Sequence, residues 1–210
     1  MKPFRLCAIT DVTGRPGLTH AAAGAAALAG GAPCVQLRAK DLPAGALLRE
    51  ARSLRAAARA ADAVFIVNDR LDVALAAEAD GVHLGQDDLP AGRARRLLPH
   101  GRILGVSTHS LPQARRAVDD GADYIGVGPV FATATKETGY APLGLAGLAA
   151  VAAAVPVPVV AIGGIGPAEA PQVIRAGAMA AAVISALMAA PDIAEATRAL
   201  LSRLAAEGLG

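Results

Sequence analysis

Two apolar stretches of this chain end in carboxylates. The stretch "FIVND" runs from Phe65 to Asp69, and "VHLGQDD" runs from Val82 to Asp88. Asp69 and Asp88 could cap the helices that follow them, because such carboxylates accept hydrogen bonds from free backbone N–H groups. They could instead share a metal ion. Two carboxylates without a Cys or His cluster suit Mg²⁺, which usually binds one or two carboxylates together with substrate phosphates.

Cationic side chains also follow apolar runs. Arg38 and Lys40 come after "CVQL", and Lys136 lies in the segment "GPVFATATKETG". Lysines are usually ordinary surface residues, but guanidinium and ammonium groups also suit phosphoryl oxygens. The segments "AIGGI", which includes Gly164, and "VIS", which ends in Ser185, are typical of a barrel phosphate site, because glycines let backbone N–H groups approach the anion. Together these segments predict two anions, a diphosphate with a metal ion and a monophosphate.

The elements that would position these groups alternate along the chain. Short runs rich in Val, Ile and Leu have the length of buried strands, and the longer Ala-rich segments between them have helical character. Helices are predicted at 47–60, 112–120, 168–176 and 193–206. Strands are predicted at Leu6–Thr10, Cys34–Arg38, Val64–Asn68, Gly81–Gly85, Ile103–Ser107, Tyr124–Gly128, Val159–Gly163 and Ala181–Ser185.

Such strand–helix units with short connections predict an α/β chain, a single (β/α)₈ TIM barrel. The chain has 210 residues, of which 54% are hydrophobic, so one core and one domain over residues 1–210 are expected. An open doubly wound sheet is the alternative. It would be supported by the glycine pattern of a dinucleotide-binding turn, which "GVGPVF" and "GGIGPA" do not have.

In a barrel the active site is built from the carboxyl ends of the strands, and the polar candidates gather at those ends. Each has an ordinary alternative. Asn68 could cap a helix, Ser107 could bond to backbone at a strand end, and His83 could be a satisfied core histidine. All of these alternatives would have to be true at once for residues on a single rim of the barrel. The opposite, amino-terminal ends of the strands carry chiefly Gly and Ala. We therefore predict one shared site, with Asp69 and Asp88 on neighbouring strands.

Charge, aromatic content and cysteine use indicate which classes of protein this chain does not belong to and where it would work. The net charge is only +2 and aromatic residues make up 2% of the chain, so nucleic-acid binding is not expected. Charged residues, Gly and Pro interrupt the apolar runs before any is long enough to span a bilayer. Cys7 and Cys34 lie in apolar runs, which predicts buried free thiols and a cytoplasmic protein. The oligomeric state stays open, a homo-oligomer included.

Taken in order, the motifs of this chain resemble the thiamine-phosphate synthase family. They are "AITD", "VQLRAKD", "FIVNDRLDVALAAEADGVHLGQDDLP", "GVSTHS", "GADYIGVGPVFATATKETG", "VVAIGGI" and "AAVISAL". The resemblance covers nearly the whole chain. "VNDR…GVHLGQDD" and "TATK" are specific in combination, whereas many phosphate-binding barrels share "AIGGI". Two places depart from the family pattern: Cys7 stands where relatives often have an aromatic residue, and "ETGYAPLG" differs from a more acidic form.

The resemblance implies a transferase of thiamine biosynthesis on a (β/α)₈ barrel. Its substrates would be 4-amino-2-methyl-5-(diphosphooxymethyl)pyrimidine and a thiazole ethyl phosphate, carboxylated or plain, and its products thiamine phosphate and diphosphate. It implies Mg²⁺ held by Asp69 and Asp88. The thiazole phosphate would be bound by Thr133, Thr135, Gly164, Ile184 and Ser185. The pyrimidine diphosphate would be bound by Gln36, Arg38, Lys40, Asn68, Ser107 and Lys136, with Lys136, Arg38 and Ser107 acting in the chemical step.

Three other functions are open from the sequence. A thiazole tautomerase on the same barrel would need the monophosphate site and a proton-transfer group such as His83 or His109, but not the paired carboxylates. A Schiff-base aldolase would use Lys136 or Lys40, and its lysine would need a pKa lowered by burial or by a cationic neighbour. A non-catalytic phosphometabolite-binding barrel would bind the precursors without turnover.

Overall fold

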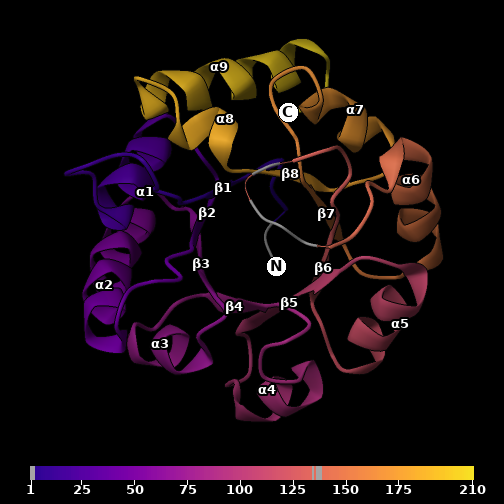
Figure 1. Cartoon of the computed structure of the whole chain (residues 1–210), viewed down its shortest axis with the longest axis horizontal. Helices are drawn as coiled ribbons and strands as arrows, with labels where there is room; N and C mark the ends of the chain where they lie inside the picture. Colours follow the sequence, from indigo (N-terminus) through magenta and orange to yellow (C-terminus); the bar gives the residue numbers. More distant parts are fainter. Residues whose placement is uncertain (1–2, 134, 136–138) are drawn as a thin grey trace.

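The computed structural model describes residues 3–133, 135 and 139–210. Within them eight parallel strands close into a barrel, in which each strand pairs with the next along the chain and the last pairs with the first. Figure 1 looks down this barrel, with the strands in the inner ring and the helices outside. The strands are β1 (Leu6–Ile9), β2 (Cys34–Leu37), β3 (Val64–Asn68), β4 (Gly81–Leu84), β5 (Ile103–Thr108), β6 (Tyr124–Val127), β7 (Val159–Ile162) and β8 (Ala180–Val183).

Helices connect successive strands and cover the outside of the barrel. Three of them begin at a side-chain cap, because Thr19, Ser110 and Asp192 each accept a hydrogen bond from a backbone N–H of the first turn. The helices are α1 (His20–Ala29), α2 (Ala44–Ala60), α3 (Leu71–Ala76), α4 (Ala91–Leu97), α5 (Leu111–Asp119), α6 (Gly144–Ala154), α7 (Ala170–Arg175), α8 (Ser185–Met188) and α9 (Ile193–Ala206).

The hydrophobic core has two layers. The outer layer lies between strands and helices, where side chains such as Phe65 and Leu54 are fully buried. The inner layer lies inside the barrel and includes Cys7, Ile66 and Tyr124. Most of its members come from the first half of each strand, so apolar side chains fill the amino-terminal part of the barrel. The carboxyl ends are left for polar side chains.

Aspartates at the amino-terminal end of the barrel have a structural role. Asp80 accepts a hydrogen bond from the backbone N–H of Phe65 at 2.8 Å, and Asp123 accepts one from Leu104 at 2.7 Å. Each carboxylate also pairs with an arginine of a surrounding helix. These contacts tie neighbouring strand–helix units together at the end of the barrel that carries no predicted site.

The prediction of a (β/α)₈ barrel is confirmed, and the pairing of β1 with β8 excludes the open doubly wound sheet. Most strands end one or two residues before the predicted position, because the chain turns out of the hydrogen-bonded ladder to form the loops of the rim. The short α8 is absent from the sequence prediction, so Ser185 begins a helix rather than ending a strand. In the part of the chain described here, no helix is both long and apolar enough to cross a membrane.

Candidate active site

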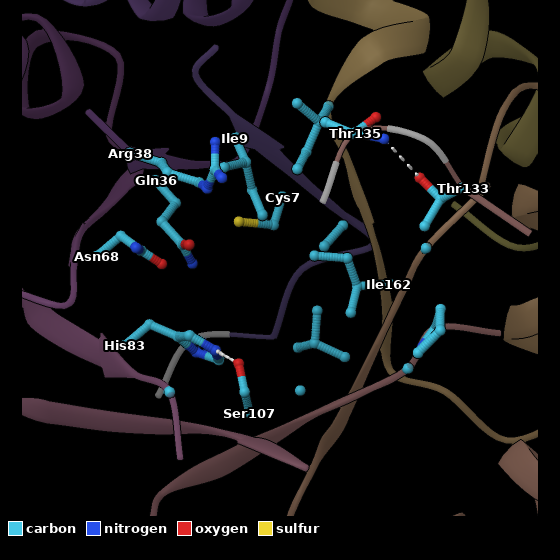
Figure 2. A pocket seen from close by; sticks show the side chains of 18 of the residues that line it. Cys7, Ile9, Gln36, Arg38, Asn68, His83, Ser107, Thr133, Thr135 and Ile162 are labelled. Atoms are coloured by element: carbon cyan, nitrogen blue, oxygen red, sulfur yellow. Dashed lines mark hydrogen bonds between the residues drawn. The ribbon is translucent and has the colours of Figure 1, made fainter. Parts of the chain in front are cut away.

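A cavity of about 410 Å³ opens at the carboxyl ends of the strands. Figure 2 shows Gln36, Arg38, Asn68 and His83 along one side of it and the loop threonines on the other. Lys136 lies outside the described residues. The other residues predicted at the site all line this cavity: Gln36, Arg38, Lys40, Asn68, Asp69, Asp88, Ser107, Thr133, Thr135, Gly164, Ile184 and Ser185.

Asp69 and Asp88 line the cavity, and a hydrogen bond holds each of them at the rim. Asp69 has a left-handed backbone with φ of 64°, and its N–H donates to the carbonyl of His83 at 2.8 Å. The Oδ2 atom of Asp88 accepts a hydrogen bond from the N–H of Gly85 at 2.6 Å. The helices that follow, α3 and α4, have no hydrogen bond from a side-chain cap. The interpretation of these aspartates as helix caps is therefore wrong.

The donor set at this rim fits a metal that binds together with substrate. Among the residues with described positions, no group of three or more His, Cys, Asp or Glu could hold a metal by itself. Mg²⁺ usually keeps several waters and takes one or two carboxylates together with phosphate oxygens. Asp69 and Asp88 provide that number of carboxylates, in a cavity that Arg38, Lys40 and Asp87 also line.

A chain of three hydrogen-bonded side chains lies at the bottom of the cavity. The hydroxyl of Tyr124 is 2.9 Å from Nδ1 of His83, and Nε2 of His83 is 2.8 Å from Oγ of Ser107. Burial raises the pKa of Tyr124 well above its ordinary value, so its hydroxyl stays protonated. The carbonyl of Ser107 accepts a hydrogen bond from Nε2 of Gln86 at 2.7 Å. His83 is thus a hydrogen-bonded core histidine that also contacts a residue predicted at the site.

Glycines allow the loops after β6 and β7 to lie against each other. Gly163 and Gly164 have φ angles of 101° and 66°, which only glycine adopts readily. A Cβ atom on Gly164 would lie 2.4 Å from the carbonyl oxygen of Ala132, so a larger residue would push the loops apart. In the same region the N–H of Thr135 donates to Oγ1 of Thr133 at 3.3 Å. This side of the cavity therefore offers hydroxyl and backbone groups, which suit a phosphate.

The chain matches the family model described as thiamine monophosphate synthase over residues 6–187. It belongs to the thiamine monophosphate synthase family. The thiamine-phosphate synthase of Chloroflexus aurantiacus is 51% identical, over 94% of this chain and 91% of the relative, and that of Moorella thermoacetica is 56% identical over 83% of each. Thiamine phosphate pyrophosphorylase from Pyrococcus furiosus superposes with a TM-score of 0.89 at 41% identity, over 98% of this chain and 97% of the other.

Membership of the thiamine monophosphate synthase family confirms two predictions made from the motifs. The predicted family is correct, and so is the predicted class of enzyme, a transferase of thiamine biosynthesis. The barrel of the related Pyrococcus protein agrees with the predicted fold.

One charged residue at the rim of this thiamine monophosphate synthase fold was missed as a site residue. Oδ2 of Asp11 lies 3.0 Å from a guanidinium nitrogen of Arg38, and the backbone N–H of Arg38 donates to Oγ1 of Thr10 at 3.0 Å. Burial raises the pKa of Asp11, but hydrogen bonds from Thr13 and the charges of Arg38 and His20 outweigh that effect, so the pKa lies below its ordinary value. Asp11 therefore stays ionised and holds Arg38 in place. Its position at the end of the first predicted strand was the available signal.

Residues from the amino-terminal half of the barrel also line the cavity. Tyr124 and Cys7 line it although they stand at or near the beginning of their strands. Cys7 and Cys34 are buried free thiols, as predicted, with sulfur atoms 3.4 Å apart. No sequence signal indicated that Tyr124 would contact the site, because its side chain lies beside a neighbouring strand rather than at its own strand end.

Proposed function

We propose that this chain joins 4-amino-2-methyl-5-(diphosphooxymethyl)pyrimidine to a thiazole ethyl phosphate, carboxylated or plain, by magnesium-assisted ionisation of the pyrimidine diphosphate. The products are thiamine phosphate and diphosphate, and a carboxylated thiazole would also lose its carboxyl group as CO₂. The observation that carries the proposal is one cavity with two kinds of anion-binding side. Arg38 and Lys40 follow β2 on one side, and glycine and hydroxyl groups follow β6, β7 and β8 on the other. Two phosphorylated precursors would therefore meet between them.

The side formed by β2 to β5 would bind the pyrimidine diphosphate. Gln36 and Asn68 carry amides, which both donate and accept hydrogen bonds, as an aminopyrimidine requires. Arg38 and Lys40 would balance the charge of the diphosphate, with Arg38 held by its ion pair to Asp11.

Two aspartates would hold the metal on the same side. Asp69 follows β3 and Asp88 follows β4, and both line the cavity, as does Asp87 beside Asp88. Mg²⁺, when bound there, would neutralise part of the charge on the diphosphate. This assignment is supported by the contacts that hold both residues at the rim: the N–H of Asp69 donates to the carbonyl of His83, and Oδ2 of Asp88 accepts from the N–H of Gly85.

The opposite side would bind the thiazole phosphate. Thr133 and Thr135 contribute hydroxyl groups from the loop after β6, Gly164 contributes backbone after β7, and Ile184 and Ser185 follow β8. A monophosphate needs fewer charges than a diphosphate with metal. The neutral donors on this side agree with that difference.

The reaction would need no nucleophile from the protein. Departure of diphosphate leaves a pyrimidinylmethyl cation, which the 4-amino group stabilises by electron donation. Arg38, Lys136 and the hydroxyl of Ser107 would stabilise the negative charge that develops on the leaving group. Holding the thiazole nitrogen beside the cation would contribute roughly 7–11 kcal/mol through proximity. Water must stay out of the cavity, because it would capture the cation.

The contacts of the candidate residues favour this reaction over its rivals. Lys40 is exposed to solvent, whereas a Schiff-base lysine is typically buried or lies beside another cation. His83 is engaged by Tyr124 and Ser107, and Nδ1 of His109 lies 2.5 Å from the carbonyl oxygen of Gly128. A thiazole tautomerase would also leave the paired carboxylates without a role.

One assay separates these functions. Purified protein, both precursors and Mg²⁺ are incubated together, and thiamine phosphate and diphosphate are quantified. We expect the two products in equal amounts. Isomerised thiazole phosphate without thiamine phosphate would instead support a tautomerase. Binding of both precursors with no product of either kind would support a phosphometabolite-binding barrel, and both of these results contradict the proposal.

Asp11→Asn is expected to weaken binding of the pyrimidine diphosphate. The change removes the charge that orients Arg38 but keeps the oxygen that accepts a hydrogen bond from the N–H of Thr13 at 2.9 Å. The KM for the pyrimidine diphosphate should rise about two- to tenfold, the effect of one ordinary hydrogen bond, with the KM for the thiazole phosphate unchanged. Equal increases in both KM values would show that Asp11 supports the fold of the rim rather than Arg38.

We also propose a cytoplasmic protein and one domain over residues 1–210. Buried free thiols at Cys7 and Cys34 support a reducing compartment. The elements from β1 to α9 all belong to the barrel or to the helices around it, which supports a single domain.

A further inference from the structure

The three side chains Tyr124, His83 and Ser107 form a hydrogen-bonded relay. The direction of donation along this relay decides whether Ser107 presents a hydrogen or a lone pair to the substrate. We propose that Tyr124 and His83 are positioning residues that make the hydroxyl of Ser107 a hydrogen-bond donor toward the departing diphosphate. The relay runs from the interior of the barrel, at Tyr124, to the cavity, at Ser107. Figure 2 shows the His83–Ser107 contact at the wall of the cavity.

The first step concerns the phenol. Tyr124 is only 4% exposed and packs in the inner apolar cluster. Within the described residues, Nδ1 of His83 is the one group at hydrogen-bond distance from its hydroxyl. A buried O–H group without an acceptor is costly, so the hydroxyl must donate to this nitrogen. The opposite direction, from Nδ1–H to the phenol oxygen, would leave the phenol hydrogen without an acceptor.

The second step concerns the imidazole. Because Nδ1 accepts from Tyr124, it carries no hydrogen itself, and the ring of His83 carries its hydrogen on Nε2. That hydrogen points at Oγ of Ser107, 2.8 Å away. Tyr124 thus selects one tautomer of His83, and His83 donates to Ser107.

The third step concerns the hydroxyl of Ser107. Its oxygen already accepts from His83, so its own hydrogen remains available to an acceptor in the cavity that Ser107 lines. In the other tautomer Ser107 would have to donate to Nε2, and only its lone pairs would face the substrate. Lone pairs repel phosphoryl oxygens, whereas an O–H group binds them. The relay therefore decides whether Ser107 attracts or repels the leaving group.

The strands around the relay are shaped to accommodate it. A Cβ atom on Gly105 would lie 2.2 Å from Cζ of Tyr124, and one on Gly126 would lie 3.0 Å from Cε1 of His83. The rings of His83 and Tyr124 lie 5.4 Å apart between centroids, inclined at 33°. Glycine at both positions therefore leaves room for the two rings beside β5 and β6.

A double-mutant cycle tests the relay through the chemical step, and this arm rests on the proposed synthase reaction. Ser107→Ala should lower kcat about ten- to a hundredfold, and Tyr124→Phe, which removes only the hydroxyl, about three- to tenfold. If Tyr124 acts through Ser107, adding Tyr124→Phe to Ser107→Ala should change kcat by less than about twofold. The KM for the thiazole phosphate should not change. Additive losses in the double variant would overturn the proposal.

A second arm does not depend on activity. In protein labelled with ¹⁵N-histidine, the imidazole ¹H–¹⁵N correlation spectrum distinguishes the two tautomers, and the chain has only four histidines to assign. His83, assigned by its loss in His83→Gln, should show the Nε2–H pattern in the unsubstituted protein and a mixed pattern in Tyr124→Phe. An Nδ1–H pattern in the unsubstituted protein would overturn the proposal even if thiamine phosphate is formed. Failure to form thiamine phosphate, with the Nε2–H pattern present, would count against the proposed function and leave the relay standing.

Discussion

Asp88→Asn is expected to lower kcat by about 10²–10³-fold while the barrel stays folded. The substitution removes a charge that would hold Mg²⁺ against the leaving diphosphate, and losses of this size follow removal of one group that stabilises developing charge. The amide keeps an oxygen that can accept the hydrogen bond from Gly85, so the loop contact at 2.6 Å is retained. Steady-state kcat over a range of Mg²⁺ concentrations measures the effect, and EDTA should abolish turnover until Mg²⁺ is restored.

A matched control separates the metal from general charge effects. Asp119 lies on α5, is exposed and does not line the cavity, so Asp119→Asn should leave kcat unchanged. Circular dichroism of both variants checks that the barrel is intact. Full activity of Asp88→Asn, or turnover of the unsubstituted protein that EDTA does not affect, would contradict the metal assignment.

A pyrimidine diphosphate with trifluoromethyl in place of the 2-methyl group is expected to react more than about a hundredfold more slowly. Electron withdrawal destabilises the pyrimidinylmethyl cation, and each tenfold loss of rate corresponds to about 1.4 kcal/mol of barrier. Direct attack by the thiazole on an intact diphosphate would tolerate the change. Single-turnover kinetics across a series of 2-substituents measures the chemical step.

Lys136→Ala tests the same ionisation step by changing the protein instead of the substrate. Negative charge accumulates on the departing oxygen as the bond breaks, so a cation that acts then lowers the barrier more than the KM. The variant should therefore lose kcat well beyond any change in KM. A flat rate across the 2-substituents, with chemistry rate-limiting, would contradict ionisation and the role of Lys136 in it.

The alternation of apolar runs and Ala-rich segments was sufficient to predict the barrel. Most buried strands show a short run rich in Val, Ile and Leu, whereas β8 is mainly alanine, and the carboxyl ends of parallel strands in a barrel lie on one rim. That rule brought residues as distant in sequence as Gln36 and Ser185 to one cavity. The prediction needed strand ends only to within a residue or two, because the loops that follow carry the site.

Contacts between side chains could not be predicted in the same way. The ion pair of Asp11 with Arg38 depends on the pairing of β1 with β2, which places the two strand ends side by side. The contact of Tyr124 with His83 depends on glycines in β5 and β6 that leave space for two rings. Sequence spacing contains neither the pairing register nor that space. The same limit applies to Asp88, where a cap and a metal ligand have the same sequence pattern.

The most direct test of the account is a crystal structure of the protein with the pyrimidine diphosphate and Mn²⁺ in place of Mg²⁺, with data collected at the manganese edge. The account predicts an anomalous peak bound by Asp69, Asp88 and the diphosphate, with Arg38 on the diphosphate and the side of Gly164 and Ser185 left for the thiazole phosphate. A diphosphate bound at Gly164 and Ser185, or manganese bound away from both aspartates, would contradict it.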